Sequence, residues 1–350
     1  MRASPQPGNR PANIHDVAAL SGVAASTVSR ALANSGRISA STGERIQAAA
    51  KQLGYVPNRQ ARALSSGRTG AIAVLVPDIS HPGYAALIKS VYFELKASGY
   101  SQLVIDTEDS AEVEATVLEQ LRKGADGVII AHSLLSDSDL LAAASRQPLV
   151  AINREVPGVS AALVDPGPAL AEALYHLVDT GHTKIAFLSG AGTLLSRSTA
   201  ERAALARAAA TRGVEIDVLG PFPPTADSGP AAAEAVNRTG ATACISSSSL
   251  LALGVVQRFK QKGIAVPGDM SVIGCEDIFC TDFCTPSLTT LASTLGGVGK
   301  AGAAMLVKMI AGPPGTAKAQ TRVQVPSTLT LRGTTAARDG GNDQEISGEQ

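Results

Sequence analysis

The chain has 350 residues, of which 45% are hydrophobic and 3% aromatic, and it contains no tryptophan. It is therefore long enough for more than one domain, and its cores must consist mainly of Ala, Val, Leu and Ile. The formal net charge is zero, but residues 1–68 carry nine basic and two acidic side chains, whereas the remainder carries 21 basic and 28 acidic ones. A basic segment joined to an acidic remainder is typical of a protein that binds a polyanion such as nucleic acid.

The composition argues against a secreted or membrane protein. Residues 1–12 are polar and proline-rich and lack the apolar core of a secretory signal, and no apolar run approaches the length of a membrane span. Four cysteines without such a signal indicate reduced thiols in a cytoplasm. We therefore expect a cytoplasmic protein with disordered tails at residues 1–12 and 336–350.

Residues 13–54 predict three short helices around one small core. Asn13 and Asp16 have the spacing of a capping box at the start of the first helix. Gly22 supplies the turn before a second helix, at about Ala25–Ala33, and a third helix spans Ser39–Leu53. Two short helices joined by such a turn form a helix-turn-helix, whose second helix enters the major groove of DNA. Three helices packed without any DNA-binding role are the alternative, and the basic charge argues against it.

Between residues 70 and 335, short apolar runs alternate with helical patterns. The runs predict strands at 71–77, 102–107, 127–132, 149–153, 161–165, 184–190, 216–220, 242–247 and 271–275. The helical patterns lie at 84–98, 111–123, 168–180, 198–212, 229–238, 250–262 and 296–311. This alternation indicates an α/β fold with parallel sheets covered by helices on both faces, and the number of strands favours two subdomains.

Parallel sheets of this kind bind ligands beyond the carboxyl ends of their strands. The polar residues at these ends are therefore candidates for ligand binding: Asp78, Thr107, His132, Asn153, Ser196, Ser248 and Glu276. No nucleophile motif, metal triad or phosphate loop accompanies them. We therefore expect no enzyme activity, no cofactor and no metal site.

Four blocks of sequence occur in order: IHDVAALSGV, STVSRAL, LGYVPNRQARAL and GRTGAIAVLVPDISHPGY. Together they resemble the N-terminal part of the LacI/GalR family of bacterial transcription regulators. The resemblance implies a helix-turn-helix DNA-binding domain at 13–56 and a hinge helix with its linker at 57–69. It implies a periplasmic-binding-protein-like effector domain at 70–335, with two lobes and crossings near 166, 292 and 325. The implied function is that of a repressor that binds a palindromic operator in double-stranded DNA as a homodimer and responds to a small effector, such as a sugar.

The resemblance also assigns DNA contacts. The positions of the second helix that face bases hold Ala25, Ser26 and Arg30, and an arginine can pair with guanine. The hydroxyl and amide side chains better placed for phosphates are Asn13, Thr27, Ser29, Ser39 and Thr42. In the hinge, Leu64 falls at the position of a leucine that enters the minor groove and kinks DNA, beside Asn58, Ala61 and Arg62. Ala24 stands where the family usually has a serine cap, which should cost the second helix about 1 kcal/mol.

For the effector, the resemblance nominates Asp78, His81, Tyr84, Asn153, Arg202, Ser248 and Glu276. Several other positions depart from the family pattern. Leu205 and Ala206 replace a glycine and an aromatic residue, and Pro166 follows Val164-Asp165 in place of an asparagine. Sugar sites hold hydroxyl groups with carboxylates and amides and cover the ring with an aromatic side chain. The departures therefore indicate a ligand other than a standard hexose, or no small ligand.

Two alternatives stay open at this point. A degenerate pocket could respond to a protein partner, or to a thiol signal through Cys275, Cys280 and Cys284, although their C-x4-C-x3-C spacing is not a recognised zinc pattern. A solute-binding protein or an enzyme on the same two lobes is less well supported. A transport protein would need a signal peptide and would have no basic N-terminal module.

Overall fold

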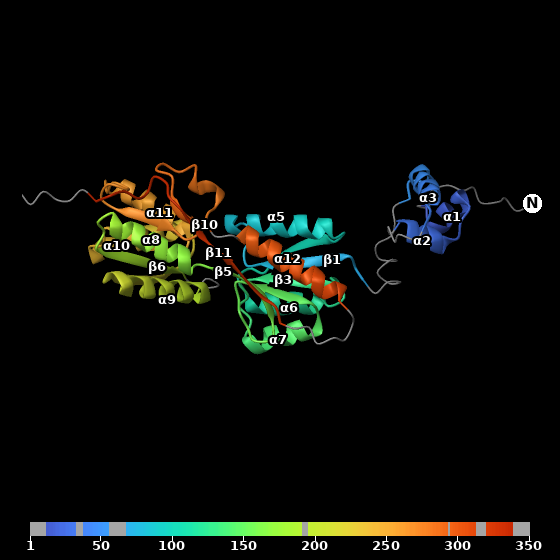
Figure 1. The fold of residues 1–350 in the computed structure, drawn as a ribbon, viewed down its shortest axis with the longest axis horizontal. Helices are drawn as coiled ribbons and strands as arrows, with labels where there is room; N and C mark the ends of the chain where they lie inside the picture. The colour runs from blue at the N-terminus through green and yellow to red at the C-terminus, as the bar shows by residue number, and fades with distance from the viewer. Residues whose placement is uncertain are drawn as a thin grey trace, which may run out of the picture. The chain divides into compact units, whose positions relative to one another are not determined.

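The computed structural model describes residues 12–32, 38–55, 68–190, 195–292, 295–312 and 320–338, except for the side chains of residues 195–200 and 202. The chain forms two compact units, Met1–Gly70 and Ala71–Gln350 (Figure 1). Most of the two predicted disordered tails lies outside the described residues, and so does the predicted hinge apart from residues 68 and 69.

The first unit contains the three predicted helices, α1 (Ile14–Ser21), α2 (Ala25–Leu32) and α3 (Ala40–Gln52). The predicted capping box is confirmed, because Asn13 accepts the backbone amide of Asp16 and the Asp16 carboxylate accepts that of Asn13 at 2.8 Å. α1 ends at a glycine with a left-handed φ of 67°. The core is formed by buried side chains from all three helices: Val17, Ala18, Val28, Ile46, Ala49 and Ala50.

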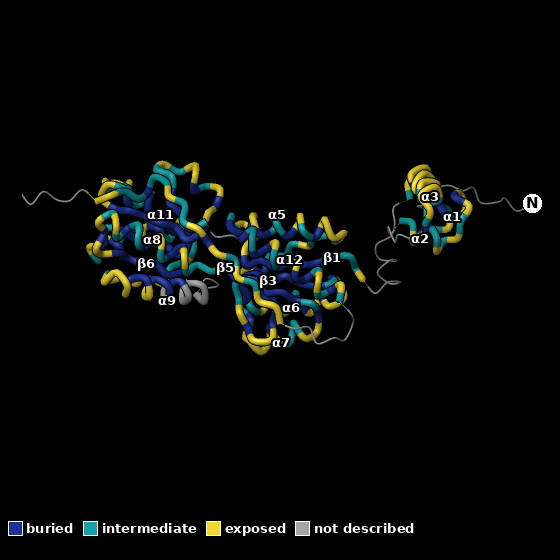
Figure 2. Tube along the Cα trace, viewed as in Figure 1, coloured by how far each residue is buried: buried dark blue, intermediate teal, exposed yellow. Residues whose placement is uncertain are grey.

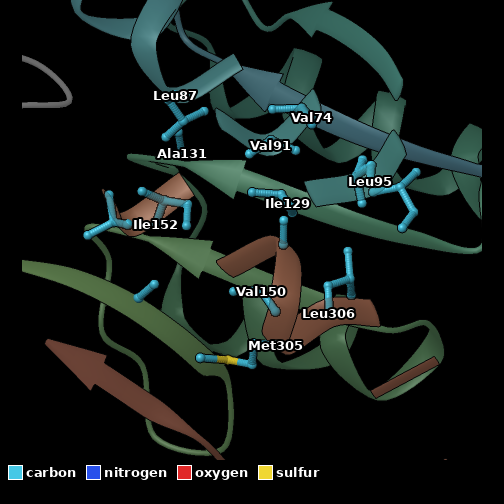
Figure 3. Close-up of a cluster of buried hydrophobic side chains, with 14 of the residues drawn as sticks. Val74, Leu87, Val91, Leu95, Ile129, Ala131, Val150, Ile152, Met305 and Leu306 are labelled. Atoms are coloured by element: carbon cyan, nitrogen blue, oxygen red, sulfur yellow. The ribbon is translucent and has the colours of Figure 1, made fainter. Parts of the chain in front are cut away.

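The first lobe of the second unit contains a six-stranded sheet in the order β11-β5-β4-β3-β1-β2, and every pairing in it is parallel. Its strands are β1 (Ala71–Val76), β2 (Ser101–Asp106), β3 (Gly127–Ala131), β4 (Leu149–Ile152), β5 (Ser160–Asp165) and β11 (Arg322–Pro326). Its helices are α5 (Pro82–Ala97), α6 (Ala111–Leu121), α7 (Asp137–Arg146) and α12 (Leu295–Ala311). Figure 3 shows the core on one face, where α5 and α12 meet the strands through Leu87, Val91, Leu95, Met305 and Leu306.

The second lobe contains a six-stranded sheet in the order β12-β10-β9-β8-β6-β7. Its strands are β6 (Lys184–Gly190), β7 (Glu215–Phe222), β8 (Ala243–Ser246), β9 (Ser271–Gly274), β10 (Thr289–Ala292) and β12 (Thr328–Thr330). Its helices are α8 (Gly167–Asp179), α9 (Leu195–Arg212), α10 (Gly229–Thr239) and α11 (Ser249–Gln261), with two short 3-10 helices at Ala226–Ser228 and Phe279–Thr281. In both lobes the central strands are buried, whereas the edge strands β2, β7 and β11 and the outer faces of the helices are more exposed (Figure 2).

The chain passes between the two sheets three times. It leaves β5 for α8 at Pro166, leaves β10 for α12, and leaves β11 for β12 at Ser327. The first and third passages are tied together, because the amide and hydroxyl of Ser327 both donate to the Asp165 carbonyl, at 3.1 and 2.9 Å. The two lobes are therefore joined by neighbouring chain segments at one edge of each sheet.

Four elements of the second unit differ from the sequence prediction. α7, β10, β11 and β12 lie in stretches for which no element is predicted, and β12 pairs antiparallel with β10, so the second sheet is not purely parallel as predicted. α7 buries only Leu140 and begins with a polar DSD segment, so its helical periodicity is weak. β12 has three residues and depends on pairing with a strand about 40 residues away. Short segments that form strands only by pairing with distant residues have few sequence features of their own from which a strand could be predicted.

The packing of α10 against α11 requires glycine at two positions. A Cβ on Gly229 would collide with the backbone of Gly254, and a Cβ on Gly254 would collide with the carbonyl group of Ala226. We predict that Gly254→Ala lowers the free energy of unfolding by about 1–3 kcal/mol, because backbone must shift to admit the methyl group. Urea denaturation followed by circular dichroism would measure the change. Gly268→Ala is the matched control, since its new Cβ would only touch the Ala265 side chain at 3.4 Å.

Residues 333–338 follow β12 as an ordered segment across the second lobe, although residues 336–338 fall in the tail predicted to be disordered. The hydroxyl group of Thr334 donates to the Val272 carbonyl at 2.7 Å, and the amide of Arg338 donates to the Thr180 carbonyl at 2.8 Å. Two histidines hold the same segment. His176 Nε2 lies 3.1 Å from the hydroxyl of Thr335, and His182 Nε2 lies 3.3 Å from the carbonyl of residue 336.

The two histidines that hold this segment have lowered pKa values. Burial lowers the pKa of His182 below its usual value of 6.5, against the opposing effect of its bond to the Ala336 carbonyl, and nearby Arg338 and His176 also lower it. Burial also lowers the pKa of His176, against the opposing effect of Asp179. The unfolded chain therefore binds more protons below about pH 6.5. We predict that the unfolding temperature of the second unit is constant above that pH and falls as the pH decreases below it. His182→Gln should make this fall less steep. His15→Gln, at an exposed histidine of the first unit, should leave the slope unchanged.

Candidate DNA-binding surface and effector pocket

α2 presents a small polar surface. Val28 is the one fully buried residue of α2. Ala31 and Leu32 are partly buried and also pack against the core formed with the other two helices. The predicted base-facing residues Ser26 and Arg30 are exposed, and so is Ser29, whereas Ala25 and Thr27 are half-buried. The structure therefore leaves three of the five predicted residues of α2 fully accessible, whereas Ala25 also packs against the core of the unit. They could offer hydroxyl groups, a guanidinium group and one methyl group to DNA.

The remaining predicted phosphate contacts lie at the N-termini of two other helices. Asn13 caps α1, and Ser39 caps α3 by accepting the Thr42 amide at 3.3 Å. The Ser39 hydroxyl also lies 2.9 Å from the hydroxyl of Thr42. Helix N-termini favour anions because their first amides point outward without intrahelical partners. Asn58, Ala61, Arg62 and Leu64 of the predicted hinge lie outside the described residues.

The first lobe joins three predicted ligand residues into one hydrogen-bonded chain. The Tyr84 hydroxyl lies 3.1 Å from His132 Nδ1, and His132 Nε2 lies 3.2 Å from Asn153 Nδ2. Asn153 Oδ1 then accepts the amide of Val164 at 2.8 Å. His132 and Asn153 both have positive φ values, 49° and 55°. Non-glycine residues adopt this conformation at an energetic cost, and they are concentrated at functional sites.

The other predicted residues of the first lobe shape the start of α5 and the strand ends. His81 caps α5, because its Nδ1 accepts the Gly83 amide at 3.1 Å. Asp78 is exposed and accepts both the amide and the hydroxyl of Ser80, and the hydroxyl bond is the main reason that the Asp78 pKa is lowered. Thr107 is buried, and its hydroxyl donates to the Val76 carbonyl. In each case the side chain bonds to a backbone group at the start of α5 or at the end of a strand, and so fixes the backbone there.

The predicted residues of the second lobe make internal contacts. Ser248 is fully buried and caps α11, and its hydroxyl lies 3.5 Å from the carbonyl of Pro224. Glu276 is also buried, and its backbone amide and carbonyl both bond to the hydroxyl of Ser249, at 3.1 and 2.5 Å. The side chains of Ser196 and Arg202 are outside the described part of the chain. The polar groups described here thus support the ends of β8 and β9.

A pocket of about 470 Å³ opens where the two lobes meet. Among the predicted ligand residues whose side chains the structure describes, Asn153 alone lines it. The other lining residues come from the start of α7, the loop after β4, the end of β5, the start of α8, α9 and β11: Asp137, Arg154, Glu155, Leu163, Val164, Asp165, Pro166, Gly167, Ala204, Arg207, Arg322 and Gln324. The volume falls within the range of small-molecule sites. The strand-end rule missed most of these residues. Several of them lie on β5 and β11, which are about 160 residues apart in sequence and meet only through their pairing.

Cys275, Cys280 and Cys284, the cysteines considered for a thiol signal, lie in and beside the loop that connects β9 to β10. Cys275 is buried, and the Cys284 thiol lies 3.2 Å from the Thr281 carbonyl and 3.1 Å from the Pro286 carbonyl. Burial raises the pKa of the Cys280 thiol, which disfavours the reactive thiolate. The residues that the structure describes contain no cluster of His, Cys, Asp and Glu able to hold a metal ion. Among the same residues, no helix is both long enough and apolar enough to cross a bilayer.

Comparisons with known proteins match both units. Residues 13–58 match the model of the bacterial regulatory proteins of the lacI family, and residues 174–335 match a periplasmic binding protein-like domain. The HTH-type transcriptional regulator DegA of Bacillus subtilis (strain 168) is 31% identical over 298 residues, which cover 82% of this chain and 88% of DegA.

Solved structures show the same fold. A lac repressor dimer bound to operator and the anti-inducer ONPF superposes with a TM-score of 0.79 at 24% identity, covering 94% of this chain and all of that one. A complex of the transcriptional regulator CelR with cellobiose gives a TM-score of 0.67 at 27% identity, covering 92% of this chain and 99% of that one.

The beginning of α2 generates a prediction about the first unit. The residue before this helix is Ala24, whose methyl side chain cannot accept an amide, and the amides of Thr27 and Val28 both donate to the Ala24 carbonyl. We predict that Ala24→Ser stabilises the first unit by about 1 kcal/mol, since a serine hydroxyl at this position can accept the Thr27 amide. Hydrogen exchange of the α2 amides in the intact chain should slow about fivefold. Ala48→Ser, at an exposed position within α3, is the control and should give no such slowing. Equal exchange in both variants would refute the capping argument.

Proposed function

The chain belongs to the lacI family of bacterial regulatory proteins, and from this membership we propose that it is a repressor that binds a palindromic operator as a homodimer. Its affinity for the operator is controlled by a small metabolite bound between the two lobes. The protein acts in the cytoplasm, where bacterial DNA lies, and the proposal includes no enzymatic step. The observation that carries it is α2, which exposes Ser26, Ser29 and Arg30 on a strongly basic unit.

Each unit has a separate task in this proposal. Arg30 and Ser26 read base edges, and the helix N-termini at Asn13 and Ser39 position the unit on phosphates. The lac repressor structure is a dimer on operator DNA, and the CelR structure contains cellobiose. By analogy, a ligand between the lobes here changes their relative angle and thereby shifts the equilibrium between DNA-binding and released states.

Selection of binding sites from a random duplex library tests the function itself. The intact chain is expected to enrich a sequence with two inverted half-sites, and its affinity should fall steeply with salt because contacts to phosphate release counterions. Arg30→Ala should relax the preference at one base pair of each half-site and weaken binding to the selected site about tenfold or more. Binding that remains equal for all sequences would contradict the assignment as an operator-specific regulator.

The predicted hinge generates a separate prediction. If Leu64 enters the minor groove at the operator centre, then Leu64→Ala should weaken operator binding about tenfold or more and leave the second unit's unfolding temperature unchanged. Fluorescence anisotropy with a labelled operator duplex measures the affinity. Leu141→Ala is the control, because this leucine is exposed on α7 of the second unit. An unchanged affinity for Leu64→Ala would remove the wedge from the mechanism.

A further inference from the structure

The pocket between the lobes contains charges of both signs, but most of them are already paired with one another. Arg154 pairs with Asp137 at 2.6 Å, and Arg322 pairs with Glu155 at 3.0 Å. Asp165 uses one carboxylate oxygen to accept the Gly167 amide at 3.0 Å. In these two ion pairs, residues that line the pocket neutralise one another. One further cationic side chain also lines the pocket.

That cation is Arg207 on α9. It is an exposed residue that lines the pocket from the second lobe. It forms no ion pair or hydrogen bond with any residue in the described part of the chain. A guanidinium group carries five N–H donors and no acceptor. An arginine that faces a pocket with its donors unused can bind a carboxylate or phosphate in a bidentate manner.

The opposite wall contributes a second donor. The backbone amide of Val164 can only donate a hydrogen bond, so the Asn153 atom that it meets at 2.8 Å must be Oδ1. The Nδ2 group therefore points to His132, whose Nε2 accepts one of its two hydrogens at 3.2 Å. The other hydrogen is left for the pocket that Asn153 lines. His132 thus acts as a positioning residue that leaves Asn153 a donor, not an acceptor, toward a ligand.

We propose that the pocket binds an anionic metabolite, a small carboxylate or phosphate, through Arg207 of the second lobe and the Asn153 amide of the first. This inference rests on the proposed function and specifies its ligand class. An anion held between these residues contacts both lobes at once, so its binding favours the arrangement in which they lie closest. A neutral polyol gains less from this pair, because it brings no charge to the guanidinium group.

Thermal unfolding and calorimetric titration of the intact protein can test the ligand class. The probes are succinate, citrate and inorganic phosphate, with glucose and sorbitol as neutral probes, all at one ionic strength set with sodium chloride. At least one anion is expected to raise the unfolding temperature and the neutral probes are not. Arg207→Gln should weaken that anion's binding about tenfold or more, which is the loss expected for a charge-assisted hydrogen-bonded pair. Arg238→Gln, at an exposed arginine near the end of α10, should bind it like the parent chain.

Asn153→Asp provides the second variant. An aspartate can still accept the Val164 amide, but it presents a negative oxygen where the amide presents a donor. Asn153→Asp should therefore weaken anion binding as well, by at least as much as Arg207→Gln. Anion binding of unchanged affinity in Arg207→Gln, or stabilisation by the neutral probes alone, would overturn the assignment of an anion held by Arg207 and leave ligand control intact. If no probe of either class binds while operator binding is normal, the anion assignment fails, and the proposal of a ligand-controlled regulator loses its support as well.

Discussion

The pairing of the two chain segments that run from the first lobe to the second constrains how the lobes can move relative to each other. β5 and β11 run side by side in register, and Ser327 bonds to Asp165 just where both segments leave the first sheet. Lobes joined in this way can rotate about the shared segments but cannot separate. Asn153 connects the pocket to the same place, since its side chain holds the amide of Val164, next to Asp165. In the proposed mechanism, a ligand at Asn153 would therefore act on the segment that joins the two lobes.

Local chemistry explains which parts of the fold could be predicted from sequence. The capping box at Asn13 and Asp16 and the turn at Gly22 are contacts within a few residues, and the strands of the central sheets are runs of β-branched side chains. α7 and β12 were missed because one buries a single side chain and the other depends on a strand far away in sequence. The order of the strands likewise depends on contacts that no local pattern contains.

Sequence patterns also predicted the candidate site only in part, because they do not give the directions of side chains. The strand-end rule found Asn153, which lines the pocket, but it also nominated Ser248 and Glu276, which are buried and bonded to neighbouring loops. The rule gives the position of a residue and not the direction of its side chain. No sequence pattern singles out Arg207, because arginines on helices are mostly exposed. The role proposed for it rests on the pairing of the neighbouring charges in the folded chain.

Thermodynamic reciprocity offers the most direct test of coupling between the two units. The operator dissociation constant would be measured by anisotropy with and without a saturating concentration of the anion that binds best, and the anion's dissociation constant would be measured with and without operator. The account predicts that both constants change by the same factor, between about 5 and 150. An operator affinity that stays constant while the pocket is saturated would show that the pocket does not control DNA binding, and would contradict the account.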